Sequence, residues 1–231
     1  MEDVIIRNNG GGMYLSFSNP TLTNVIISDN TAGYHGGGML LYSSDPLLSH
    51  VTISGNTAEG MRITDSSDPI LTDVMISENT AEYGGGMNLY YSSPALTNVT
   101  ISGNAANYGG GMVQTGTSSS ILMDVTITDN SGGGIISTNS QSSLSLTNVT
   151  IANNSGGNGG AVIIDGSTAA LVNCILWNNS PSYQFDAAIV VSYSNIQGGY
   201  QGEGNIDADP LFVDAVNGDY HLTSTSPCID A

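Results

Sequence analysis

Two acidic residues recur at corresponding places in this sequence, with a separation that would suit glycoside hydrolysis. Glu59 and Glu82 each follow a Thr-Ala pair, in the segments TAEG and TAEY. If these segments lie one above the other in stacked strands, the two carboxylates would be about 5 Å apart. That is the spacing of a retaining catalytic pair. Duplication of a repeat also creates such aligned pairs without any catalytic role. Acidic residues in turns usually just face water.

His35 and Arg62 form a second arrangement with chemical potential. A lyase acting on uronates needs a base to remove a proton and cations to stabilise the enolate. The only other basic residue among lysine and arginine, Arg7, lies near the start of the chain, and the D, DD, GHG and RIK signatures of polygalacturonases are absent. We therefore expect no catalytic residues, and keep His35 and Arg62, with Glu59 and Glu82, as the enzymatic alternative.

No metal site or other cofactor is predicted, and calcium is the alternative left open. The glycine clusters are followed by apolar residues, so they do not match the calcium-binding nonapeptide GGxGxDxUx. The densest group of carboxylates lies in the tail and lacks the register of an EF-hand. This group consists of Asp207, Asp209, Asp214 and Asp219.

These residues belong to a sequence that repeats about every 24 residues. LTNVTISGN at 96–104 returns as LTNVTIANN at 146–154. Leucine, valine, isoleucine and methionine each recur in step, and so does an asparagine. The predicted asparagine ladder comprises Asn30, Asn56, Asn79, Asn104, Asn130, Asn154 and Asn179, with Asn9 before it.

Within each repeat, apolar residues alternate with Thr or Ser at period two, which is typical of a strand with one buried face. Short strands and tight turns at this period predict an all-β fold, a parallel β-solenoid of about 8–9 coils. We expect coils over 1–179, and the last coil with a C-terminal cap over 180–231 of the same domain. The NGD segment at 217–219 predicts a hairpin covering the last coil. The ladder asparagines are expected to stack their amides and to tolerate left-handed backbone.

Outward positions after the glycine clusters could hold a ligand. Tyr42 and Tyr90 should share a column with Thr64 between them, while Arg62 and Asn88 belong to the neighbouring column. Aromatic rings and polar groups on a solenoid face could bind an extended neutral glycan. Exposed Tyr and Thr also simply suit strands. A second outward face is rich in Thr and Ser, with Ile26 and Met75 interrupting it.

The chain is strongly acidic, with 20 acidic residues against two arginines and a formal net charge of −18. Nucleic acid and anionic lipid are therefore not expected as partners. No apolar run is long enough to span a membrane. A lysine-free acidic surface favours an extracellular setting. Cys174 and Cys228 could pair in an oxidising compartment or remain separate thiols.

The pairing of I-S-x-N with GGG-M is similar to the FxxN and GGA[IL] motifs of polymorphic outer membrane proteins. The tail segments NCILWNNS at 173–180, VSYSNIQGGYQGEGNIDADPLFVD at 191–214 and NGDYHLTSTSPCIDA at 217–231 resemble the closing part of β-helix domains in choice-of-anchor surface proteins. The resemblance covers nearly the whole chain. It implies a single-stranded, right-handed parallel β-helix, secreted or displayed on a bacterial surface, with flanking domains in a longer protein.

Together these observations favour a non-catalytic structural or adhesive module whose partner is a polysaccharide or another surface protein. Two alternatives stay open. One is a polysaccharide hydrolase or lyase of the pectin-lyase-like fold. The other is a spacer without a ligand, which could assemble by stacking end to end.

Overall fold

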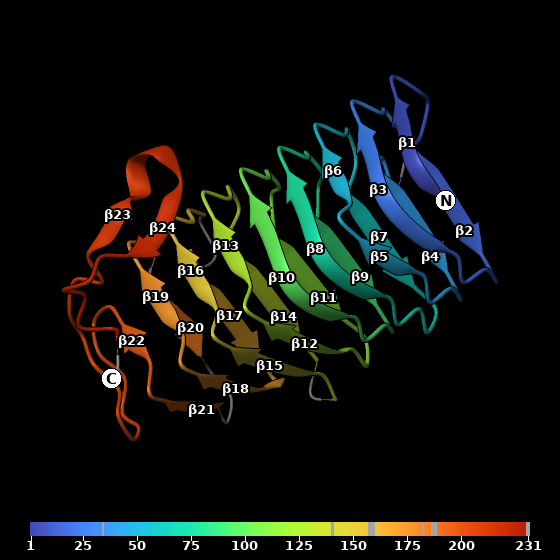
Figure 1. Ribbon diagram of the computed structural model, residues 1–231. Helices are drawn as coiled ribbons and strands as arrows, with labels where there is room; N and C mark the ends of the chain where they lie inside the picture. Colours follow the sequence, from blue (N-terminus) through green and yellow to red (C-terminus); the bar gives the residue numbers. More distant parts are fainter. Residues whose placement is uncertain (34, 140, 157–159, 182, 186–188, 230–231) are drawn as a thin grey trace.

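The chain winds into a parallel β-solenoid whose successive coils stack along one axis (Figure 1). The structure, a computed structural model, describes residues 1–33, 35–139, 141–156, 160–181, 183–185 and 189–229. Like side chains lie above like because every coil pairs in register with the next. Val25 lies above Val4, for example, and Ile27 above Ile6.

Two parallel sheets form the walls of the solenoid. The larger sheet contains β1 (Glu2–Arg7), β3 (Thr21–Ser28), β5 (Leu47–Ser49), β6 (Thr52–Ser54), β8 (Ile70–Ser77), β10 (Ala95–Ser102), β12 (Ser119–Met123), β13 (Thr126–Thr128), β15 (Ser143–Thr147), β16 (Thr150–Ala152), β18 (Thr168–Val172), β19 (Ile175–Trp177), β21 (Ile189–Ser192) and β22 (Asn195–Ile196). The smaller sheet contains β2 (Met13–Ser16), β4 (Met39–Tyr42), β7 (Met61–Thr64), β9 (Met87–Tyr90), β11 (Met112–Thr115), β14 (Ile135–Thr138), β17 (Val162–Asp165) and β20 (Gln184–Phe185).

The larger sheet bends once in each coil, so it supplies two walls. At the bend one residue has a φ between 50° and 56°, which shifts the inward and outward alternation by one position. Asn and Asp tolerate this left-handed conformation better than other residues with a side chain, and they hold nearly every bend. The bend residues are Asp3, Asn24, His50, Asp73, Asn98, Asp124, Asn148, Asn173 and Tyr193.

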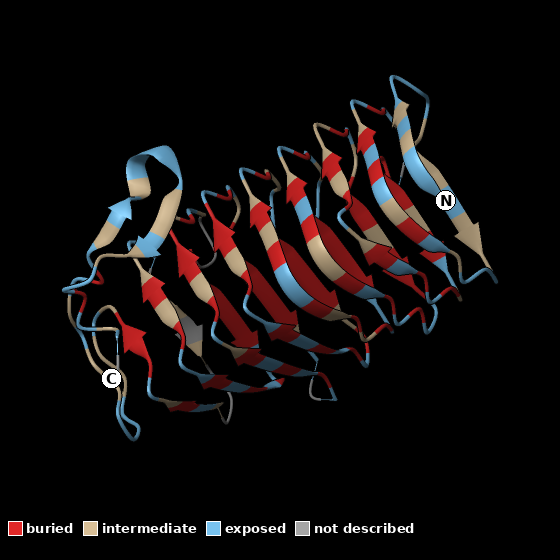
Figure 2. Ribbon diagram, in the orientation of Figure 1, coloured by how far each residue is buried: buried red, intermediate tan, exposed pale blue. Residues whose placement is uncertain are grey.

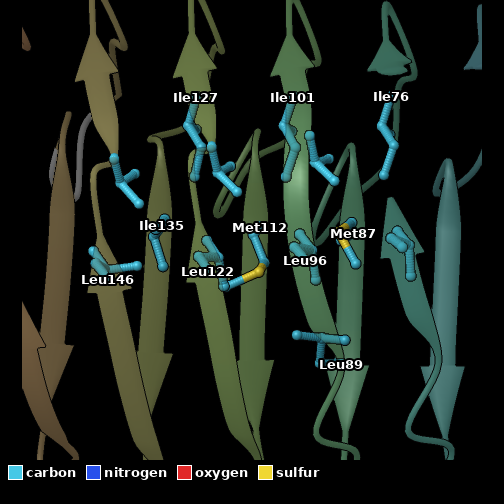
Figure 3. Close-up of a cluster of buried hydrophobic side chains, with 14 of the residues drawn as sticks. Ile76, Met87, Leu89, Leu96, Ile101, Met112, Leu122, Ile127, Ile135 and Leu146 are labelled. Atoms are coloured by element: carbon cyan, nitrogen blue, oxygen red, sulfur yellow. The ribbon is translucent and has the colours of Figure 1, made fainter. Parts of the chain in front are cut away.

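The predicted apolar columns fill the interior, as the red inward positions of Figure 2 show. Figure 3 shows Ile76, Ile101 and Ile127 in one column, with Met87 and Met112 from the smaller sheet facing the leucines. Each of these side chains is fully buried. Since burying one such side chain is worth roughly 1.5–3 kcal/mol, the columns explain why the sequence must repeat.

The asparagine ladder is confirmed. Asn79 donates through its backbone N and its side-chain Nδ2 to Asn104 Oδ1, each at 3.0 Å. It also donates from Nδ2 to the carbonyl of Ile53. The same pattern links the ladder from Asn30 to Asn179.

The expectation that the ladder asparagines take left-handed backbone is wrong. The left-handed residue is the one before each ladder asparagine, because the chain must turn before the amide can point inward. These turn residues are Asn8, Asp29, Gly55, Glu78, Gly103, Asp129, Asn153 and Asn178.

The tail forms the predicted hairpin, but the hairpin does not close the end of the solenoid. β23 (Phe212–Asp214) pairs antiparallel with β24 (Asp219–Leu222), and a short 3₁₀ turn, η1 (Ala215–Asn217), joins them. Tyr220 of β24 reaches back along the side of the solenoid and donates to Asp129 Oδ2. The expected position over the last coil is therefore wrong, because this contact holds the hairpin beside earlier coils.

Three aromatic rings close the C-terminal end instead. Tyr183 and Phe185 stack at 4.6 Å, and Tyr200 meets both rings edge to face. All three pack against the interior columns. Within the described part of the chain, no helix has the length and apolar character needed to cross a membrane.

Candidate functional site

Glycine turns fold over the outer face of the smaller sheet. Gly84 has a φ of 59°, and a Cβ there would lie 2.8 Å from Asn88 Cβ. Gly109 is packed just as closely onto Val113 in the next coil. The outward column is therefore covered where we expected an open surface. Asn88 is only 8% exposed, so a ligand cannot reach the predicted Asn88 contact while the turn is in place.

Arg62 lies in the same outward column and is about three-quarters buried. In its coil, three residues fewer separate the ladder asparagine from the inward methionine than in the following coil, so its glycine turn is short. Gly60 N donates to Gly85 O, and Gly38 N donates to Glu59 O. Glu59 thus occupies the place that Gly85 holds in the following coil.

The expected register of Glu59 with Glu82 is therefore wrong. The three missing residues shift Glu59 inward, where it is 4% exposed, whereas Glu82 remains on the surface. The matching TAE segments could not reveal this, because the deletion falls directly after them. Catalysis by either residue stays a prediction.

Four donors surround the Glu59 carboxylate. Its Oε1 lies 3.2 Å from Arg62 Nη1, 3.1 Å from Asn88 Nδ2 and 3.3 Å from His35 Nδ1. Its Oε2 accepts from the backbone N of Gly36 at 2.9 Å. Arg62 offsets the buried charge and the other donors satisfy the oxygens, so the group has the features of a structural ion pair.

The residues of the enzymatic alternative nevertheless meet at one place. They line a pocket of about 90 Å³ together with Tyr83 and Asn88. Its full lining is His35, Ala58, Glu59, Arg62, Ala81, Glu82, Tyr83 and Asn88. A pocket of this size holds a few waters and no sugar ring.

Exposed aromatic rings gather at the other end of the smaller sheet's strands. Tyr42, Thr64 and Tyr90 share one column, as predicted. Phe17 meets Tyr42 edge to face at 5.6 Å, and Tyr91 meets Tyr90 edge to face at 4.3 Å. We call Phe17, Tyr42, Tyr90 and Tyr91 the aromatic strip.

Phe17 and Tyr91 were not predicted as site residues. Both have left-handed backbone, with φ of 49° and 52°, at a turn position where other coils carry Ser43, Asp65 or Gly116. A bulky side chain in this conformation is a genuine outlier. The sequence signal is a large aromatic residue at a turn position that small or polar residues hold elsewhere.

A second pair of rings lies near the pocket. Tyr83 and Tyr108 stack at 5.4 Å with an interplanar angle of 9°, and both come from glycine turns in successive coils. Sequence reasoning missed this pair, although the recurring segments AEYGGG and ANYGGG carry it.

The cysteines and the tail carboxylates are engaged with neighbouring groups of the chain. Among the described residues, no three side chains of His, Cys, Asp or Glu converge on one point. Cys174 and Cys228 are both free thiols, and Cys228 Sγ accepts from Asn195 Nδ2 at 3.1 Å. Asp209, Asp214 and Asp219 each accept hydrogen bonds from their own neighbours in the tail.

Comparison with known proteins gives one match. A family model described as a right handed beta helix region matches residues 1–111 and again residues 84–201. No curated protein and no solved structure matches the chain.

Proposed function

The chain belongs to the family of right-handed β-helix regions, and on that premise we propose that it is a non-catalytic, extracellular or cell-surface module that holds a neutral polysaccharide against the aromatic strip. The family accounts for the solenoid, which is a rigid structural element. The finer parts of the proposal rest on the surface of this chain.

The observation that carries the proposal is the strained backbone at Phe17 and Tyr91. Folding alone does not require aromatic residues there, because neighbouring coils make the same turn with Ser43, Asp65 and Gly116. Backbone strain of this kind persists mainly where a functional surface uses the side chain. Gly116 also leaves room for its neighbour, since a Cβ there would lie 3.0 Å from the Tyr91 ring.

The spacing of the rings suits an extended chain. Tyr42 and Tyr90 are two coils apart, which is about 10 Å along the axis. Between them, Thr64 donates its hydroxyl to Asp65 Oδ2 at 2.7 Å. Sugar rings could stack on the aromatic faces while their hydroxyls bond to this polar coil.

Charge favours a neutral ligand. A formal net charge of −18 repels polyanions, and Arg62, one of the two arginines, is already paired with Glu59. We assign Arg62 and Asn88 to holding the glycine turn and not to ligand contact. The same charge supports the extracellular proposal.

Binding to neutral and acidic polysaccharides on an array, with and without calcium, tests the proposal. Tyr42→Ala and Tyr90→Ala should each lower the affinity for any neutral polysaccharide that binds by about 3- to 10-fold, which is the contribution of one aromatic contact. Tyr108→Ala is the control, because Tyr108 is as exposed as Tyr90 but lies outside the strip. Equal losses in all three variants, or a hit that depends on calcium, would contradict the proposal. Binding to nothing would favour the spacer.

The enzymatic alternative has a separate test. If the Glu59 pocket were catalytic, Glu82→Gln would abolish turnover of any polysaccharide that the chain degrades, and binding at the strip would remain. Unchanged turnover in this variant would remove Glu82 from consideration.

A further inference from the structure

The hairpin borders a polar groove on the outer face of the larger sheet. Its floor is the Thr- and Ser-rich outer face of β10 and β13, and its wall is β24 with the turn before it. A space of about 420 Å³ lies between them, which is within the size range of small-ligand sites. The lining residues are Asn98, Thr100, Ser102, Thr126, Thr128, Asp129, Gly218, Tyr220 and His221.

The floor presents hydroxyls in a regular grid. Thr100 pairs with Thr126, and Ser102 pairs with Thr128, in adjacent strands. The rows are therefore about 4.8 Å apart, with nearly 7 Å between successive outward residues of one strand. Within the described part of the chain, the hydroxyls of Thr100, Ser102 and Thr126 make no hydrogen bond, so they are free to meet a ligand.

Tyr220 fixes the wall. Its hydroxyl donates to Asp129 Oδ2 at 2.9 Å and accepts from Asn153 Nδ2 at 2.7 Å. Phe212 packs edge to face on its ring at 5.2 Å. Burial, followed by the hydrogen bond to Asp129, raises the pKa of Tyr220 above the ordinary value of a phenol.

The chemistry of the lining selects the ligand. Threonine and serine hydroxyls both donate and accept, as sugar hydroxyls do. Asp129 borders the groove, and His221 is held by Asp219 at 2.6 Å. Carboxylates at the wall disfavour an anion. Gly218, also in the wall, has no side chain that would narrow the groove.

We propose that this groove is a second carbohydrate site, which takes a short neutral saccharide and is independent of the aromatic strip. The two sites lie on different walls of the solenoid. A chain that carries both would bind two glycan segments at once.

Amide chemical shifts in nitrogen-15-labelled protein test the groove directly. The probes are cellobiose as the neutral disaccharide, digalacturonate as the anionic one and the disaccharide of glucosamine as the cationic one. We expect cellobiose to shift amides at 98–102, 126–129 and 218–221, and the two charged probes to leave them unchanged. No shifts with cellobiose, shifts confined to other segments, or stronger binding of a charged probe would overturn the proposal.

Removal of the hydroxyls supplies the matched comparison. The double variant Thr100→Val with Thr126→Val keeps β-branched side chains in the strands and should weaken cellobiose binding at least tenfold. Thr52→Val changes the same outward row outside the groove and should leave binding unchanged. The row already carries Ile26 and Met75, so apolar residues are compatible with the fold. Equal affinity in the double variant and Thr52→Val would overturn the proposal.

The two proposals fail separately. Tyr42→Ala removes a ring of the aromatic strip and should not alter cellobiose shifts in the groove. The double valine variant should likewise leave polysaccharide binding at the strip intact.

Discussion

Cys174 follows Val149 in an interior column that holds valine in the earlier coils and Ser194 in the last one. Its side chain is 1% exposed, and burial raises the pKa of the thiol from 9.0 to about 11. In the unfolded chain the thiol ionises near pH 9, while in the folded chain it stays protonated. Cys174 therefore stabilises the fold below about pH 9, and this contribution is lost as the pH rises toward 11.

We predict that Cys174→Val removes the part of the decrease in the free energy of unfolding between pH 9 and 11 that this thiol causes. Two pKa units correspond to as much as about 3 kcal/mol. Urea unfolding at several pH values, in wild type and variant, measures the difference. Cys228→Ser serves as the control, because Cys228 lies outside the interior columns and should keep the wild-type slope. If the free energy of unfolding of Cys174→Val decreased with pH as steeply as that of wild type, Cys174 would ionise in the folded chain as readily as in the unfolded one.

The ladder gives a second prediction for single residues. Asn104→Ala leaves the backbone N and Nδ2 of Asn79 without their acceptor, and the carbonyl of Ile76 without a donor. Each buried group left unpaired costs about 1–3 kcal/mol, so we expect a loss of more than about 3 kcal/mol in the free energy of unfolding. Chemical denaturation measures it. Asn107→Ala, at an exposed position, should cost less than about 0.5 kcal/mol, and similar losses in both variants would contradict the assigned role of the ladder.

Single residues also show how far the sequence predicts the structure. The ladder could be predicted because the same residue type recurs at the same interval. The left-handed turn before it was not placed, although Asn, Asp or Gly holds seven of its eight positions, because the ladder asparagine beside it is equally compatible with that conformation. The buried place of Glu59 was hidden as well, since a deletion changes the register in space without changing the local TAE motif.

At the scale of elements, lengthening the glycine turn that follows Glu59 tests the role of this residue. Insertion of Tyr-Gly-Gly between Glu59 and Gly60 would restore the NTAEYGGGM pattern of the following coil. The longer turn should move Glu59 to the surface and leave Arg62 buried without its partner. We expect this to destabilise the protein by about 3–5 kcal/mol, the cost of breaking a buried ion pair.

A second change should rescue the insertion. In the following coil a long glycine turn covers an asparagine, Asn88. Arg62→Asn in the insertion variant reproduces this arrangement, so the free energy of unfolding should return to near the wild-type value. Thermal unfolding of the insertion variant with and without Arg62→Asn measures the rescue. An insertion that is harmless alone would mean that the Glu59 pair contributes nothing to folding.

The strands and the hairpin were predictable as elements, but the position of the hairpin was not. Alternation within each repeat predicts the strands, and the NGD turn predicts the hairpin. Its position depends on the hydrogen bonds of Tyr220 with Asp129 and Asn153, which are 91 and 67 residues away in the sequence. Nothing in the local sequences marks these residues as partners. The groove bordered by the hairpin was hidden for the same reason.

At the scale of the whole molecule, each coil contacts only its neighbours, so stability should vary along the axis. Among the described strands, β1 pairs only with β3 and β2 only with β4, and the interior columns are half-buried in this first coil. At the other end, Tyr183, Phe185 and Tyr200 cover the columns. The two ends should therefore open with different ease.

Hydrogen exchange measures this difference along the axis. We expect the slowest amides in β8 to β14, the fastest in β1 and β2, and intermediate protection in β18 to β22, because the aromatic rings shield that end from water. Tyr200→Ala removes a ring that contacts both of the others. It should speed exchange in β18 to β22 and leave β3 and β4 unchanged, since the effect of a mutation in a solenoid fades over neighbouring coils. Equal acceleration in all strands would show instead that the coils unfold as one cooperative unit.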